Sequence, residues 1–299
     1  MSSGKPRTAF TPQGTLVFMV ILSFVAALIL SVMASALRVP QQEARELDRS
    51  KEMLKSALIL NNKGFFQLPN PEGLDLPAKV EKEGELVGTD REITPTESDV
   101  LAVYNRRIRP FVVNDKGELS TFEKENIPYN KYLDEFKKVG YFTRPWKLIY
   151  QILPNEGDQP EGWIIPINGY GLWDAIYGYL AIKPDGNTVI GTSWYDQKET
   201  PGLGANITEW SWQKQFPGKV IFQPSPDGQT DLKTAPLGIV VVRGKVNEVF
   251  GNQPRAKNAV DGMAGATLTG NGVTAAFTDV LTGYRPFLVK LQSDTHGTK

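Results

Sequence analysis

Two threonine hydroxyls, those of Thr267 and Thr269, lie in a run of small residues that leads directly into an amphipathic helix. The run reads DGMAGATLTGNG over residues 261–272, and apolar residues then recur at helical spacing from Val273 to Tyr284. The first turn of a helix has backbone N–H groups without intrahelical acceptors, and the helix dipole adds partial positive charge there, so an anionic group is favoured. The residues alone leave two alternatives open: a site for an anionic ligand, or a helix cap that follows a tight turn.

Two further glycine-bearing segments are candidates for the same chemistry. They read GYGLWD at residues 169–174 and ETPGLG at residues 199–204. None of the three segments is a nucleotide-binding motif. Asn271 stands where a P-loop needs its lysine, and the glycine pair at 169 and 171 lacks the third glycine of a dinucleotide fingerprint.

Several common chemistries are excluded by residue counts. The 299 residues include one histidine, His296, and no cysteine. A Ser/His/Asp triad, a Cys/His dyad and a His-ligated zinc site are therefore not expected, and thiolate-ligated metals and iron–sulfur clusters are ruled out. Lysine and arginine number 33 and so do aspartate and glutamate, which argues against a nucleic-acid partner.

Short β-rich runs separated by turns outnumber helical patterns downstream of residue 98, and the helices do not alternate regularly with the strands. This pattern predicts an α+β domain with a mostly antiparallel sheet. Helices are expected around residues 129–139 and 272–283. The predicted strands cover residues 100–104, 109–114, 148–153, 163–167, 175–182, 188–195, 220–223 and 238–242.

Residues 16–37 are almost wholly apolar and contain no charge. At about 1.5 Å per residue they extend for roughly 33 Å, enough to cross a hydrocarbon core of about 30 Å. A cleaved signal peptide is the alternative, but the run is longer than a usual signal core. Lys5 and Arg7 precede the run, whereas Arg38, Arg45, Arg49 and Lys51 follow it, so a count of basic residues slightly favours an inward-facing domain. A long domain can cross regardless of such charge, which leaves the orientation open.

The sequence thus divides into six expected parts. An amphipathic helix is expected after the apolar run, with Ala44, Leu47, Leu54 and Leu58 at helical spacing, as a stalk or docking helix. The next segment is rich in Pro, Gly and charge and is expected to form loops and short elements. The parts are an N-terminal tail at 1–15 on the cytoplasmic side, a transmembrane helix at 16–37, the amphipathic helix at 38–60, the loop-rich segment at 61–98, a folded domain at 99–290 and a polar tail at 291–299.

The run from Asp261 to Val273 resembles the flavinylation motif of the FMN-binding domain family. Together with GLWD at 171–174, ETPGLG at 199–204 and the single N-terminal helix, it is similar to the C subunit of the Na⁺-translocating NADH:quinone reductases, and this resemblance covers essentially the whole chain. The chain departs from the motif at Ala264, where the family usually has Ser or Thr, and at Gly270, where it usually has Ser. Neither change removes the threonine that matches the attachment point.

The resemblance implies a covalently bound FMN, joined by a phosphoester to Thr267 in a step performed by a separate flavin transferase. Asp261 matches the motif's acidic residue. It is expected either to contribute to recognition by the transferase or to shape the local turn. Tyr170 and Trp173 are candidates for the flavin pocket, although buried aromatic residues usually belong to a core. The other expected cofactor-binding residues are Glu199, Thr200, Gly202, Leu203, Gly204, Gly265, Ala266, Leu268 and Thr269.

The function implied is electron relay within the NADH:quinone reductase complex, coupled to Na⁺ export by the whole assembly, with no independent active site on this chain. The partners would be the other subunits of the complex, and the family places the soluble domain on the outer, periplasmic face of a bacterial inner membrane. Two alternatives remain. One is the related flavoprotein subunit of a ferredoxin:NAD⁺ oxidoreductase complex. The other is a flavin-free, membrane-anchored scaffold protein, in which the glycine segment is only a helix cap.

Overall fold

The computed structural model describes residues 11–68, 75–157, 159–227 and 230–296. Lys5 and Arg7 of the charge count lie outside the described residues. The chain forms two compact units, Met1–Glu46 and Leu47–Lys299. Helix α1 (Pro12–Ser56) contributes to both of them.

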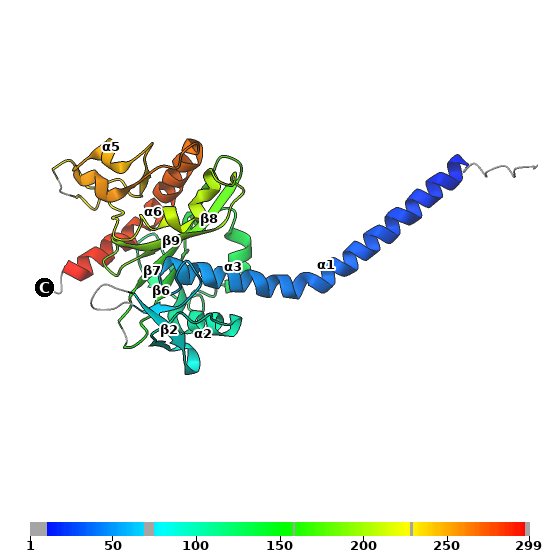
Figure 1. Cartoon of the computed structure of the whole chain (residues 1–299), viewed down its shortest axis with the longest axis horizontal. Helices are drawn as coiled ribbons and strands as arrows, with labels where there is room; N and C mark the ends of the chain where they lie inside the picture. Colours follow the sequence, from blue (N-terminus) through cyan, green and yellow to red (C-terminus); the bar gives the residue numbers. More distant parts are fainter. Residues whose placement is uncertain (1–10, 69–74, 158, 228–229, 297–299) are drawn as a thin grey trace, which may run out of the picture. The chain divides into compact units, whose positions relative to one another are not determined.

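The second unit is built on a six-stranded sheet, of which β6 to β9 are labelled in Figure 1. The strand order is β5-β4-β6-β7-β8-β9, and every neighbouring pair is antiparallel. The observed sheet confirms the predicted α+β class and the mostly antiparallel arrangement. The strands are β4 (Ile108–Val113), β5 (Leu119–Ser120), β6 (Lys147–Ile152), β7 (Gly162–Tyr170), β8 (Ala175–Ile182) and β9 (Val189–Asp196).

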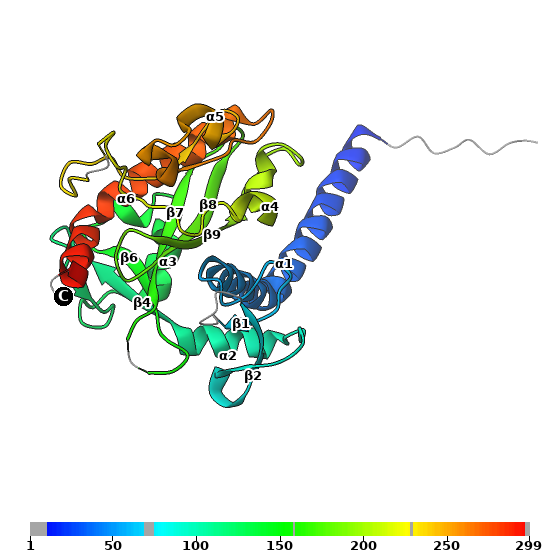
Figure 2. The same ribbon diagram turned by 60° about the vertical axis from the view of Figure 1, so that its left-hand side comes forward.

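Both faces of this sheet are covered by helices, as Figure 2 shows. Successive strand residues point to opposite faces, so Ile164 joins one core and Ile165 the other. One core is formed against α6 (Thr267–His296), whose Phe277 and Tyr284 are fully buried. The other core is formed against the last part of α1, α2 (Glu97–Arg107) and α3 (Tyr129–Phe136).

Smaller elements complete the second unit. A three-stranded antiparallel sheet joins β1 (Gln67–Leu68), β2 (Leu76–Val80) and β3 (Leu86–Gly88), and it lies within the segment expected to be loop-rich. A short parallel pair joins β10 (Val240–Val241) and β11 (Ala259–Val260). The short helices are η1 (Lys82–Gly84), η2 (Tyr141–Thr143), η3 (Gly204–Thr208), α4 (Trp210–Gln213), α5 (Val246–Phe250) and η4 (Pro254–Asn258).

The first unit contains a helical segment, Pro12–Arg38, that is long and apolar enough to cross a membrane. Its side chains are exposed along the whole segment, as expected of a helix that would face lipid. Further along α1, Leu47, Met53 and Leu54 are buried in the core of the second unit. We expected the amphipathic helix to extend to residue 60, but α1 ends at Ser56 because Leu58 adopts a left-handed backbone conformation with φ of 56°.

Residues 100–104 are not the strand that we predicted, because they lie in the middle of α2. The apolar run VLAVY is short enough to resemble a buried strand, but a capping box fixes the helix. The Thr96 hydroxyl accepts a hydrogen bond from the Asp99 backbone N–H at 3.2 Å, and the Asp99 carboxylate accepts one from the Thr96 N–H at 2.8 Å. The T-x-x-D pattern was visible in the sequence and was the missed signal.

Other element boundaries also differ from the prediction. Residues 220–223 form only isolated bridges, at Val220 and Phe222, instead of a strand. Helix α6 is longer at both ends than residues 272–283, since it begins at Thr267 and continues to His296, into the expected polar tail. Gln292 in that tail is buried, so the tail contributes to packing.

Candidate functional site

The site is built around the N-terminus of α6, which begins at Thr267. The chain enters the helix through a tight turn, in which the Ala266 N–H donates to the Met263 carbonyl at 3.1 Å. Gly265 has φ of +72° in this turn, a conformation that L side chains rarely adopt. Ala266 is buried, whereas Thr267 is exposed on the helix surface. The hydroxyl that matches the attachment point is therefore presented to solvent by a fixed turn.

The first turn of α6 has the properties of an anion site. The first hydrogen bond of the helix runs from the Gly270 N–H to the Ala266 carbonyl at 3.0 Å. Among the described residues, no acceptor lies within hydrogen-bond reach of the N–H groups of Thr267, Leu268 and Thr269. These donors and the helix dipole can hold the single negative charge of a phosphodiester on Thr267.

The loop at residues 199–204 packs directly against this helix start. A Cβ placed on Gly204 would lie 2.5 Å from the Thr269 Oγ, and one placed on Gly265 would lie 2.9 Å from the Leu203 side chain. The turn at residues 171–174, which joins β7 to β8, lies against the same loop, since the Trp173 indole N–H donates to the Thr200 hydroxyl at 3.1 Å. Segments far apart in the sequence thus meet at one point.

Glu199 connects the three segments. Its carboxylate accepts hydrogen bonds from the Thr269 hydroxyl at 2.5 Å, from the Trp173 N–H at 3.0 Å and from the Leu172 N–H at 3.1 Å. The residue is only 5% exposed. Burial raises the pKa of the carboxyl, but these hydrogen bonds outweigh burial and hold its pKa below the ordinary value.

The two threonines of the motif therefore have different environments. Thr269 is 1% exposed and its hydroxyl donates to Glu199, whereas Thr267 is exposed and has no hydrogen-bond partner for its hydroxyl among the described residues. Two positions along an α-helix correspond to a rotation of about 200°, so the two side chains project from opposite sides of α6.

Large apolar side chains remain exposed on the segments that meet at the start of α6. They come from β7, the 171–174 turn, the 199–204 loop and the first turn of α6, and a cluster of this kind indicates a ligand or partner surface. A flavin ring needs such apolar cover with a few polar contacts at its edge, so the residues fit FMN. The exposed fractions are 74% for Tyr170, 48% for Leu172, 68% for Trp173, 41% for Leu203 and 59% for Leu268.

Asp261 faces α5. Its carboxylate accepts hydrogen bonds from the Val246 N–H at 2.8 Å and from the Lys245 ammonium group at 3.0 Å. Burial raises the pKa of Asp261, but the Val246 and Lys245 hydrogen bonds together hold its pKa below the ordinary value. These contacts satisfy a donor at the start of α5, so the geometry favours a role in turn structure over a direct contact with a cofactor.

The structure thus brings most of the predicted residues together at the start of α6: Trp173, Glu199, Thr200, Leu203, Gly204, Gly265, Ala266, Thr267, Leu268 and Thr269. Gly202 has φ of +76° and serves the turn of its loop, with no atom close to where its Cβ would lie. Sequence reasoning missed Leu172, whose N–H binds Glu199 and whose side chain joins the exposed apolar cluster. Its place in a turn beside Trp173 was the available signal.

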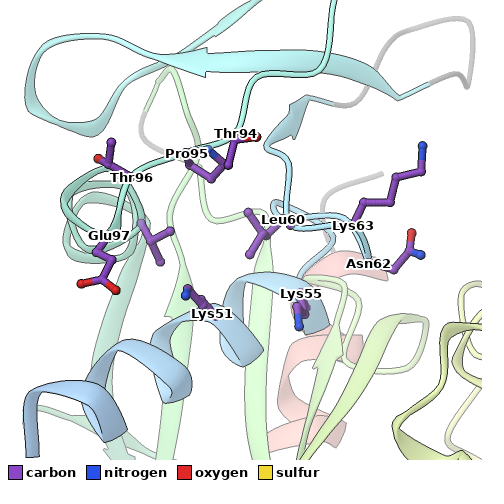
Figure 3. Close-up of a pocket in the computed structure, with 11 residues that line it drawn as sticks. Lys51, Lys55, Leu60, Asn62, Lys63, Thr94, Pro95, Thr96 and Glu97 are labelled. Carbon is purple, nitrogen blue, oxygen red and sulfur yellow. The ribbon is translucent and has the colours of Figure 1, made fainter.

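A separate pocket lies between α1, the loop after it and the start of α2 (Figure 3). It is lined by Lys51, Lys55 and Lys63 among others, and none of the predicted cofactor-binding residues lines it. Lys55 is paired with Glu52 at 2.7 Å and Lys63 with Glu92 at 3.1 Å. The pocket therefore does not compete with the α6 start as the candidate site.

Comparison with known proteins places the chain in a family. Residues 171–282 match the FMN-binding domain model. The whole chain is 37% identical to the C subunit of the Na(+)-translocating NADH-quinone reductase of Chlamydia caviae, and the match covers all of both proteins. The chain belongs to this C-subunit family. The relative of the same name from Pasteurella multocida is 29% identical, with 94% of each chain covered.

The fold of this C-subunit family member is also found in a solved structure. The crystal structure of the Parabacteroides distasonis relative matches with a TM-score of 0.54 over 84% of this chain and 96% of that one, at 24% identity. The predicted cofactor-binding residues, from Trp173 to Thr269, all lie within the range that matches the FMN-binding domain.

Proposed function

We propose that this chain is a membrane-anchored electron carrier that holds FMN as a phosphoester on Thr267. The observation that carries this proposal is the exposed Thr267 hydroxyl at a helix start whose first three N–H groups have no acceptor among the described residues. The match of residues 171–282 to the FMN-binding domain supports FMN as the ligand.

The attachment would be performed by a flavin transferase, because the Thr267 hydroxyl has no hydrogen-bond partner among the described residues that could act as a general base. The Thr267 Oγ would form a bond to the FMN phosphorus of FAD, the pyrophosphate bond would break, and AMP would leave with release of the hydroxyl proton. The chain's part is to present the hydroxyl and to hold the resulting phosphodiester on the N–H groups of Thr267 to Thr269.

When bound, FMN supplies reversible electron transfer, and the protein sets its potential and exposure. Trp173 and Leu203 would cover the ring with apolar surface, and the Thr200 hydroxyl would fix Trp173 through its indole N–H. A covalent tether keeps the cofactor on the chain in both redox states, which suits a relay between neighbouring subunits.

The names of the relatives support the wider assignment. Those proteins are subunits of Na(+)-translocating NADH-quinone reductases. We infer that this chain passes electrons on the route from NADH to quinone within such a complex, which as a whole would couple the transfer to Na⁺ export. The single apolar helix would anchor the chain in a bacterial inner membrane with the second unit on the outer face. The ferredoxin:NAD⁺ oxidoreductase alternative has no support among these relatives.

The decisive experiment is intact mass and in-gel fluorescence of the full chain co-expressed with a flavin transferase. The wild type should gain one FMN less one water, and Thr267→Ala should gain nothing. Thr282→Ala removes an exposed hydroxyl further along α6 and should be modified like the wild type. An unmodified wild type, in cells that flavinylate a control protein, would contradict the proposal and favour the scaffold alternative.

A further inference from the structure

The first turn of α6 carries two hydroxyls, those of Thr267 and Thr269. Glu199, 70 positions before Thr269, gives the two hydroxyls different surroundings. Glu199 is buried and forms no ion pair with a cation among the described residues. Its charge is compensated by hydrogen bonds that include those from the Thr269 hydroxyl and from the N–H groups of Leu172 and Trp173. An ionised carboxylate buried without a cation is costly unless its hydrogen bonds are made.

Thr269 is held inward by this arrangement. Its hydroxyl proton is directed at the Glu199 carboxylate, at 2.5 Å, and its side chain is 1% exposed. An incoming phosphorus atom would have to displace Glu199 to reach the Thr269 oxygen. The first turn of a helix frays more readily than its middle, so this hydrogen bond is what opposes outward rotation of Thr269.

The glycines of the 199–204 loop make the arrangement tight. A Cβ at Gly204 would lie 2.5 Å from the Thr269 Oγ and 2.7 Å from a Glu199 carboxylate oxygen. The loop therefore approaches α6 with no side chain between them. The Thr269 hydroxyl therefore lies directly against the backbone at Gly204.

From this geometry we propose that Glu199 is a positioning residue that selects Thr267 over Thr269 as the flavin acceptor. The proposal rests on the proposed function, since it concerns the same transfer step. Glu199 acts by sequestering Thr269, and by tying the 171–174 turn and its own loop to the helix start, without itself contacting the transferred phosphoryl group. Glutamine at this position has one acceptor oxygen and an NH₂ group, so three converging donors cannot all be satisfied.

The test compares Thr267→Ala with the double variant Thr267→Ala/Glu199→Gln, each incubated as the full chain with a flavin transferase, FAD and Mg²⁺. Peptide mass spectrometry locates the flavin. With Glu199 intact, the Thr269 hydroxyl remains hydrogen-bonded to Glu199, so Thr267→Ala should be essentially unmodified. In the double variant the initial rate of flavin transfer to Thr269 should rise at least tenfold. A tenfold rise corresponds to about 1.4 kcal/mol, consistent with loss of a hydrogen bond to a charged group.

The triple variant, with Thr269→Val added, is the matched control and should lose the new modification. Equal rates in the single and double variants, with thermal melts showing that both are folded, would overturn the proposal. If the double variant does not fold, Thr267→Ala/Glu199→Asp replaces it. Its shorter carboxylate is drawn away from the Thr269 hydroxyl, and an unmodified Thr269 there would overturn the proposal.

Failure of the proposed function gives a different result. In that case the wild type itself acquires no flavin, and both proposals fall together. If only the positioning proposal fails, the wild type is modified at Thr267 while Thr269 remains equally unreactive in the single and double variants.

Discussion

At the scale of single residues, the balance between burial and hydrogen bonding at Glu199 predicts a pH-dependent contribution to stability. At pH 7, Glu199→Gln should lower the free energy of unfolding by about 1–3 kcal/mol, because a buried charged acceptor is lost. The carboxyl has its ordinary pKa of 4.5 when unfolded and a lower pKa when folded. The unfolded state therefore binds the proton first as the pH falls through this window, and the stabilisation present above pH 4.5 is lost.

Urea denaturation of both proteins at pH 7 and at steps down to pH 3 would measure this difference. The difference in the free energy of unfolding between wild type and Glu199→Gln should become smaller below pH 4.5. A difference that stays constant or grows at low pH would contradict the assigned direction of the pKa shift. Glu123→Gln, a change at an exposed position, should stay within about 0.5 kcal/mol of the wild type at pH 7.

From the sequence, the residues of the site could be predicted only where they belong to the three recognised motifs. Family resemblance pointed to Thr267, Trp173 and the 199–204 loop, and the structure brings them together. The pairing of Thr269 with Glu199 joins residues 70 positions apart, so no local spacing could indicate it. Asp261 was expected at the site because of its place in the motif, but its partners on α5 are set by tertiary packing.

At the scale of elements, α6 must lie very close to β7 for Thr267 to meet the two loops. A Cβ on Gly272 would lie 2.0 Å from the Tyr170 carbonyl oxygen. Gly to Ala in a helix ordinarily stabilises it by about 1 kcal/mol. Here the contact is with backbone, which cannot rotate away, and overpacking costs about 1–3 kcal/mol. Gly272→Ala should therefore lower the free energy of unfolding and the flavinylated fraction together.

Thermal melts and intact mass after co-expression with the transferase would check this prediction. Gly270→Ala is the matched control, since its added Cβ would meet a side chain, Val241, at 3.0 Å. It should change stability less than Gly272→Ala. A stabilised Gly272→Ala protein with full flavinylation would show that helix and strand can separate without loss of the site.

Five of the six strands of the central sheet were predicted from apolar runs bounded by turn residues, and β8 agrees with its predicted limits. The two-residue strand β5 was not predicted. Helix α2 was not predicted, because its apolar residues 100–104 fit a buried strand equally well. Its capping box decided the outcome through hydrogen bonds between Thr96 and Asp99. In short apolar runs, the residues before the run therefore carry more information than the run itself.

At the scale of the whole molecule, two physical rules disagree about which side of the membrane holds the second unit. Four basic residues follow the apolar segment and two precede it: Arg38, Arg45, Arg49 and Lys51 against Lys5 and Arg7. The basic-residue count therefore predicts that the second unit lies on the cytoplasmic side. A long domain can nevertheless translocate regardless of such charge, and the proposed function puts it outside. A transmembrane helix has the same structure in either orientation across the membrane, so the orientation must be measured directly.

The absence of cysteine makes that measurement simple, because one introduced cysteine is the sole thiol in the chain. Lys116 is exposed in the second unit, and Ser3 precedes the apolar helix. A charged maleimide cannot cross the hydrocarbon core. In intact spheroplasts it should label Lys116→Cys and should label Ser3→Cys only after lysis. The opposite pattern would mean that the basic residues had retained the second unit inside, and Thr267 would then receive its flavin on the cytoplasmic side.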